Sequence, residues 1–188
     1  IVRTDIPGLD QLVAMPLGAV AVTLFTVAGV TNSINIIDGL HGLASMCVAL
    51  MMVGLAYVAL EVGDRFVAFH AVVVLGAVLG FFVWNYPRGL VFLGDGGAYF
   101  LGFMLAELGI VLVIRNPDVS PLFPLLLAIY PICETLFSMY RRRIVRGRPV
   151  SMPDGIHLHT LVYRRIIRWA LGVPGAERVT RRNSAASP

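Results

Sequence analysis

Long apolar stretches alternate with short polar turns along most of the chain, and this pattern predicts helices that cross a membrane. A helix needs roughly 20 residues to cross a hydrocarbon core. Five stretches have about that length: Leu12 to Thr31, Gly42 to Leu60, Phe66 to Trp84, Ala98 to Ile114 and Pro121 to Tyr140. A backbone exposed to lipid must also satisfy its own hydrogen bonds, which favours helices. We therefore predict one all-α, polytopic transmembrane domain over residues 1–188, with about five spanning helices and a short amphipathic tail.

The composition supports a membrane protein. Of the 188 residues, 57% are hydrophobic and only 14% are charged. The mean hydropathy of +0.81 is above that of ordinary soluble domains. The chain starts at Ile1 without the basic region and cleavage site of a signal peptide. We expect it to be the C-terminal part of a longer protein that continues beyond Pro188.

The basic residues predict how the spans are oriented. All fifteen are Arg, and cytoplasmic loops of membrane proteins collect Arg and Lys. If the segment after Tyr140 is cytoplasmic, twelve of the fifteen lie on that side, and only Arg3, Arg65 and Arg115 lie outside. Because these arginines lie beside membrane spans, anionic head groups and phosphorylated ligands are better partners for them than nucleic acid.

Three polar side chains recur at every third position near the cytoplasmic end of the first span: Asn32, Asn35 and Asp38. Residues three apart on a helix are neighbours on one face. They therefore form a polar strip that can hydrogen-bond a ligand. A structural role is equally open, because Asn and Asp also cap helices and join neighbouring helices in membrane bundles.

The loop before the fourth span contains Phe92 and Asp95, with glycines on both sides of the aspartate. Glycines allow a phosphate and its Mg²⁺ to come close, and Mg²⁺ prefers one or two carboxylates together with phosphate oxygens. Phe92 can offer its ring to a flat base. The alternative is that Asp95 only caps the helix that follows, accepting hydrogen bonds from backbone N–H groups.

The arginine-rich segment contains His157 and His159, which are two positions apart. In an extended chain, side chains at alternate positions point to the same side. Such a pair can bind a metal or contact phosphate, whereas a basic loop alone is only the usual cytoplasmic charge signal. Three further ionisable residues lie within spans: His70, Glu107 and Glu134. We favour packing or ion-pair roles for these three, although intramembrane carboxylates often mark functional sites.

Three sequence runs, in this order, resemble the polyprenyl-phosphate N-acetylhexosamine-1-phosphate transferases: N-x-x-N-x-x-D-G-x-x-G-L, F-L-G-D-G-G and P-D-x-x-H-L-H. The family includes phospho-MurNAc-pentapeptide translocase. The resemblance covers essentially the whole chain and is strongest to enzymes that begin O-antigen or exopolysaccharide units. It implies Mg²⁺-dependent transfer from a UDP-N-acetylhexosamine to undecaprenyl phosphate, with release of UMP. It also implies a bacterial inner membrane location and a site that faces the cytoplasm.

The resemblance also implies roles for individual residues. Asp95 corresponds to a Mg²⁺ ligand, Asn35 and Asp38 to the nucleotide-sugar pocket, and Phe92 to an aromatic residue that faces uracil. The two histidines correspond to residues that contact the donor phosphates. The predicted catalytic residues are Asp38, Asp95, His157 and His159. The predicted substrate-binding residues are Asn32, Asn35, His41, Phe92 and Arg148.

Three departures from the family pattern limit these assignments. The family often has a second Asp where this chain has His41, and a further His where it has Thr160. Its paired-aspartate motif belongs to an earlier loop that this chain lacks, so we expect the isolated chain to be inactive. A homodimer and membrane lipids are further expected partners, and the sugar stays undecided. The alternatives are a transporter with polar residues near the bilayer midplane, or a non-catalytic membrane fragment.

Overall fold

The computed structural model describes residues 1–145, without the side chains at positions 142 and 145. This part of the chain contains helices and no strand. The helices are α1 (Leu9–Val13), α2 (Pro16–Ile37), α3 (Leu43–Glu61), α4 (Arg65–Asn85), α5 (Gly94–Arg115), α6 (Leu122–Leu127), α7 (Ile129–Tyr140) and a π-helical turn (Arg141–Val145). The predicted all-α class is thus confirmed over the described residues.

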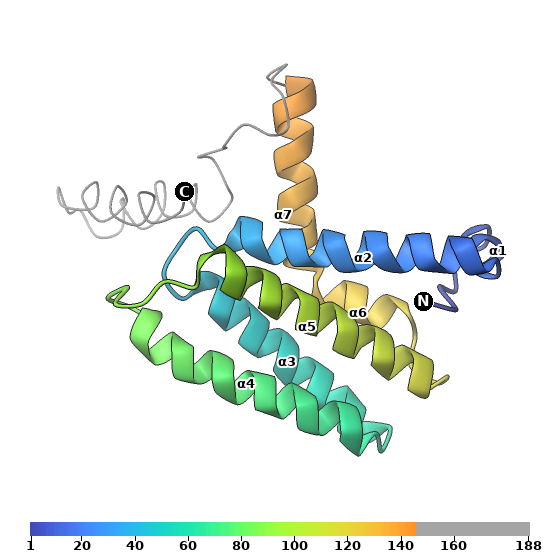
Figure 1. Cartoon of the computed structure of the whole chain (residues 1–188), viewed down its shortest axis with the longest axis horizontal. Helices are drawn as coiled ribbons and strands as arrows, with labels where there is room; N and C mark the ends of the chain where they lie inside the picture. The colour runs from blue at the N-terminus through green and yellow to red at the C-terminus, as the bar shows by residue number, and fades with distance from the viewer. Residues whose placement is uncertain (146–188) are drawn as a thin grey trace.

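Helices α2 to α5 form a bundle, and each is long and apolar enough to cross a membrane. Helix α3 packs along α4, α2 packs along α5, and contacts between α3 and α5 join the two pairs. Figure 1 shows the four helices side by side, with successive helices running in opposite directions. We call one end of the bundle the Asp95 end, where α2 and α4 finish and α3 and α5 begin. The opposite end is the Arg115 end.

Small residues let the bundle helices approach each other closely. Ala59, Ala71 and Ala98 are each 0% exposed. A Cβ atom added at Gly102 of α5 would lie 2.6 Å from the Cα atom of Thr31 on α2. Close backbone approach gives membrane helices the van der Waals contact that replaces the hydrophobic effect in lipid. Gly102 therefore allows α2 and α5 to lie near enough for their polar ends to meet.

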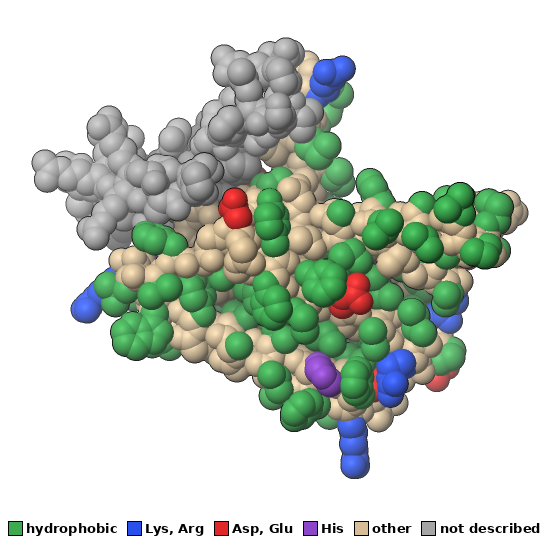
Figure 2. Space-filling view, in the orientation of Figure 1, with side chains coloured by type: hydrophobic (Ala, Val, Ile, Leu, Met, Phe, Trp, Pro, Cys, Tyr) green, Lys and Arg blue, Asp and Glu red, His purple; other side chains and the backbone are tan. Residues whose placement is uncertain are grey.

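The outside of the bundle is apolar. Figure 2 shows hydrophobic side chains spread over the visible face of the helices, with few charged groups among them. Leu17, Phe25 and Val83 are 84%, 81% and 72% exposed. A helix that is hydrophobic on all sides is either buried in a large protein or spans a membrane. The exposed apolar surface is therefore suited to contact with lipid chains.

The fifth predicted span is not one helix, and the prediction of a continuous span from Pro121 to Tyr140 was wrong. The segment forms α6 and α7, which meet at Ala128. Helix α7 contacts α2 and projects out of the bundle beside it (Figure 1). Pro131 explains the break. It has no N–H to donate to the carbonyl of Leu127, and its ring would clash with that carbonyl in a continuous helix.

The Arg115 end is held by a buried carboxylate. Asp64 caps α4 by accepting hydrogen bonds from the N–H groups of Phe66 and Val67. The same side chain accepts from Arg115 Nε at 2.7 Å and from Asn116 Nδ2 at 2.9 Å. Burial by itself would raise the pKa of Asp64, but these hydrogen bonds and the positive charge of Arg115 outweigh it and lower that pKa to about 2. The turn between α3 and α4 is thereby tied to the end of α5.

A candidate carboxylate site at the Asp95 end

A hydrogen bond between two predicted site residues joins the end of α2 to the beginning of α5. Asn35 Nδ2 donates a hydrogen bond to Asp95 Oδ1 at 3.0 Å, across 60 positions of sequence. Asn35 lies in the last turn of α2, and Asp95 lies in the first turn of α5. The packing of α2 along α5 brings these turns together. Two sequence runs that were predicted to serve one site are therefore neighbours.

Asp38 is the second carboxylate of this region. It follows the last residue of α2 and is partly buried. Burial disfavours its charged form, and the negative charge of Asp95 disfavours that form further, so the pKa of Asp38 rises to about 6. Within residues 1–145, no three His, Cys, Asp or Glu side chains gather in one place. The described part of the chain thus supplies a pair of mutually repelling carboxylates.

The helix-capping alternative for Asp95 is wrong. The cap position of α5 is Leu93, and no side chain makes a capping hydrogen bond there. Asp95 is the second residue of the helix, and it is exposed. A negative side chain in the first turn is favoured by the helix dipole. The carboxylate of Asp95 is accordingly held by Asn35 and open to solvent on its other side.

Two rings from different loops form an aromatic surface beside the carboxylates. The rings of His41 and Phe92 have centroids 5.4 Å apart and are tilted by 40°. Gly89 passes directly behind His41 with a φ of +61°, and an added Cβ atom there would lie 2.4 Å from His41 Nε2. Only glycine combines that backbone conformation with that approach. The loop after α4 is therefore shaped around the ring of His41.

Sequence reasoning missed Asn85, the last residue of α4. Its side chain accepts a hydrogen bond from the N–H of Gly42 and donates one to the carbonyl of Val91 at 2.8 Å. It is only 5% exposed. The available signal was a lone Asn at the end of an apolar span, two residues before Pro87.

The other predicted site residues are distributed as follows. Asn32 is exposed on α2, one turn before Asn35. His157, His159 and Arg148 lie outside the described residues. The expected meeting of three segments is therefore observed for two of them, the runs that carry Asp38 and Asp95.

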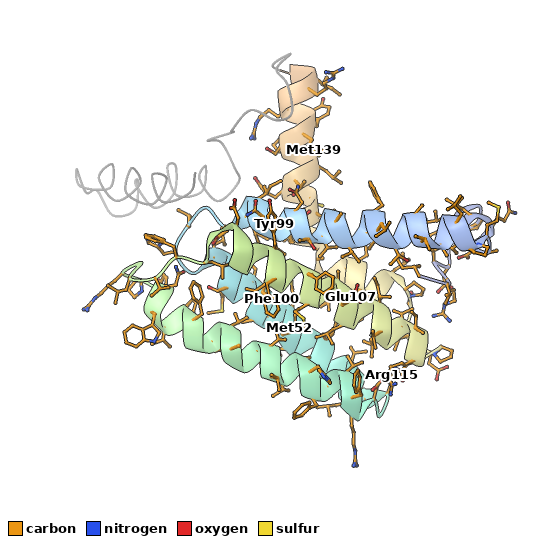
Figure 3. The ribbon with its side chains drawn as sticks, viewed as in Figure 1. Met52, Tyr99, Phe100, Glu107, Arg115 and Met139 are labelled. Atoms are coloured by element: carbon orange, nitrogen blue, oxygen red, sulfur yellow. The ribbon has the colours of Figure 1, made fainter. Side chains whose placement is uncertain are left out.

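Two of the ionisable residues within helices lie away from the Asp95 end, His70 near the start of α4 and Glu107 midway along α5. The ring of His70 packs against two phenylalanines of α4, which agrees with a packing role. Glu134 of α7 is buried at 4% exposure. Glu107 lies midway along α5 (Figure 3), whereas Asp95 lies in the first turn of that helix. An apolar cavity of about 310 Å³, lined by the N-terminal segment, α2, α5 and α6, includes Arg3 and Ile114 and so lies toward the Arg115 end.

The fold and the site together define a class of protein: a multi-pass helical membrane protein with paired carboxylates and an aromatic surface at one end of its bundle. The chain belongs to glycosyl transferase family 4, which matches residues 2–113. The family resemblance noted from the sequence is thereby confirmed, and the first two of its three runs lie within the matched residues.

Curated relatives agree with this family. A "probable undecaprenyl-phosphate N-acetylglucosaminyl 1-phosphate transferase" of Bacillus subtilis is 32% identical over 156 residues, 82% of this chain and 43% of that protein. An "undecaprenyl-phosphate alpha-N-acetylglucosaminyl 1-phosphate transferase" of Thermotoga maritima is 33% identical over 142 residues, 75% of this chain and 42% of that protein.

A third relative is a phospho-N-acetylmuramoyl-pentapeptide-transferase of Streptococcus thermophilus, 30% identical over 138 residues, 72% of this chain and 41% of that protein. The chain therefore spans less than half the length of the relatives it matches. No solved structure matches the chain.

Proposed function

We propose that the protein containing this chain transfers N-acetylhexosamine 1-phosphate from a UDP-sugar to undecaprenyl phosphate. The observation that carries the proposal is the hydrogen bond between Asn35 and Asp95, with Asp38 beside them. It joins the two sequence runs to which the family resemblance assigns the nucleotide sugar and its metal. The names of the three relatives support the same class of reaction.

The residues of the site fit a magnesium ion. One carboxylate, Asp38, follows the end of α2, and the other, Asp95, lies in the first turn of α5. Oxygen ligands of this kind are those that Mg²⁺ prefers. A Cβ atom added at Gly94 or Gly96 would meet nothing within 4 Å. The space beside Asp95 is therefore open to a phosphate. Asp95 would hold the ion with Asp38 close by, and the ion would supply positive charge to the pyrophosphate of the donor.

The reaction exchanges one phosphate linkage for another. An oxygen of the lipid phosphate attacks the phosphorus linked to the sugar, the bond from that phosphorus to the UMP oxygen breaks, and UMP leaves. Both reactants are anions, so the protein must bring them together and hold negative charge. Asn35 would orient Asp95, while Phe92 and His41 would offer their rings to the uracil base. His157, His159 and Arg148 are the proposed phosphate contacts.

We place the Asp95 end in the cytoplasm of a bacterial inner membrane. Arg88 lies in the loop at this end, whereas Arg3, Arg65 and Arg115 lie at the other. This orientation therefore depends on counting the arginines from Arg141 onward with Arg88, on the cytoplasmic side. A cytoplasmic site suits a soluble nucleotide sugar, while the prenyl tail of the acceptor stays in lipid. The product would then enter cell-wall, O-antigen or exopolysaccharide synthesis.

A donor panel tests the proposal. The full-length protein in detergent micelles is mixed with undecaprenyl phosphate, Mg²⁺ and one of UDP-N-acetylglucosamine, UDP-N-acetylgalactosamine or UDP-MurNAc-pentapeptide. UMP release and lipid-linked sugar are measured with and without EDTA. We expect one donor to yield both products in equal amounts, and EDTA to stop the reaction. Folded protein that releases UMP from no donor would contradict the proposal.

A further inference from the structure

Asn85 is a polar side chain buried at the Asp95 end, although its neighbours in sequence are exposed. Trp84 and Tyr86 are 61% and 52% exposed, whereas Asn85 is 5% exposed. A buried amide is stable only when its hydrogen-bonding groups find partners. In this position both the oxygen and the nitrogen of the Asn85 amide form hydrogen bonds.

The two partners belong to the two segments that carry the candidate site. The N–H of Gly42 donates to Asn85 Oδ1, 43 positions away, and Asn85 Nδ2 donates to the carbonyl of Val91. Gly42 follows directly after His41 and ends the turn that begins at Asp38. Val91 comes directly before Phe92. One amide thus bridges the turn after α2 and the loop before α5.

The packing around this bridge leaves little freedom. Gly42 has a φ of +83°, and an added Cβ atom there would lie 2.9 Å from carbon atoms in the rings of Phe82 and Tyr86. The turn is therefore pressed against the end of α4. Only a side chain with an acceptor and a donor on one planar group can serve Gly42 and Val91 together. Asp lacks the donor, and Leu, of similar volume, lacks both groups.

We infer that Asn85 is a positioning residue that sets the spacing between the turn carrying Asp38 and His41 and the loop carrying Phe92. Its catalytic consequence rests on the proposed function, because that spacing would determine how the uracil ring and the donor phosphates reach the site. Its structural part does not depend on any reaction.

Amide hydrogen exchange tests the structural part, read at single residues in the full-length protein. In wild type, the N–H of Gly42 should be protected even though it lies outside the hydrogen bonds of α3. In Asn85→Ala and Asn85→Leu it should exchange roughly tenfold faster or more, because a buried donor loses its partner. The Leu variant keeps the side-chain volume and so separates hydrogen bonding from cavity formation.

Asn116→Ala is the matched control. Asn116 also donates hydrogen bonds from its amide, to Asp64 and to the carbonyl of Leu112, but it does so at the Arg115 end. It should lower stability without exposing Gly42. An unprotected Gly42 in wild type, unchanged exchange in the Asn85 variants, or equal loss in the Asn116 variant would each overturn the inference.

Kinetics test the catalytic part. In the Asn85 variants, the KM for the UDP-sugar should rise roughly tenfold, as expected when one buried hydrogen bond that orders the site is lost, while Asn116→Ala keeps the wild-type KM. Faster exchange at Gly42 with wild-type KM and kcat would overturn the positioning role. If wild type transfers no sugar phosphate, the proposed function fails, and the exchange experiment still decides whether Asn85 bridges the two segments.

Discussion

Replacing Asp64 with Ala should lower the free energy of unfolding by about 2–3 kcal/mol. The side chain is 2% exposed and makes four hydrogen bonds, to two backbone N–H groups of α4 and to Arg115 and Asn116. Loss of a helix cap costs about 0.5–2 kcal/mol. The pKa of about 2, against 3.8 for a free Asp, corresponds to roughly 2 kcal/mol. These two contributions overlap, and because Arg115 is 50% exposed, water screens its share.

The pH dependence of this effect has a definite sign. The pKa of Asp64 is lower in the folded protein than in the unfolded chain. Its charged form therefore stabilises the fold at pH values above about 4, and this stabilisation is lost as the pH falls toward 2. The difference in stability between wild type and Asp64→Ala should shrink over the same range, apart from the part due to lost packing.

The assay is equilibrium unfolding of the full-length protein in mixed micelles, at pH 7 and at steps down to pH 2. Glu61→Ala is the control, because Glu61 is an exposed carboxylate at the end of α3, three positions before Asp64, and its loss should change stability by less than about 0.5 kcal/mol. Arg115→Ala should lose the ion pair and keep the cap of α4. The reasoning is refuted if Asp64→Ala is no more destabilising than Glu61→Ala. It is also refuted if the stability difference between wild type and Asp64→Ala does not depend on pH.

Three further predictions concern the site. Asp95→Asn in the full-length protein should nearly abolish Mg²⁺-dependent UMP release while membrane insertion, measured by fractionation, stays intact; wild-type activity would remove Asp95 from the metal site. Gly89→Ala should raise the KM for the donor several-fold, because its Cβ would displace His41. Gly63 also has a positive φ, +75°, but has open space around it, so Gly63→Ala controls for backbone strain. An equal rise in KM in both variants would contradict the role given to His41. The 188-residue chain alone should release no UMP, and measurable transfer by purified chain would disprove that.

The helical bundle could be predicted because its physical cause is local. Crossing hydrocarbon requires a run of apolar residues of sufficient length, and α2 to α5 are such runs. Helical periodicity also predicted a strip of Asn32, Asn35 and Asp38. Asn32 and Asn35 do lie one turn apart on α2, whereas Asp38 follows the end of the helix. The break at Ala128 was missed because counting apolar residues ignores Pro131, whose missing N–H ends the helix regardless of hydrophobicity.

The meeting of distant residues depends on how the helices pack. From the sequence alone we could predict that Asp95 lies between glycines just before a span and that Asn35 lies near the end of another span. The sequence did not show that the two side chains are in contact. Only the tertiary structure decided this, because Gly102 lets α2 lie close to α5 and so joins positions 60 residues apart. Asn85 belongs to the same category. In the sequence it is a single Asn at the end of an apolar span. Its role arises because folding brings two backbone groups, at Gly42 and Val91, within hydrogen-bonding distance of its amide.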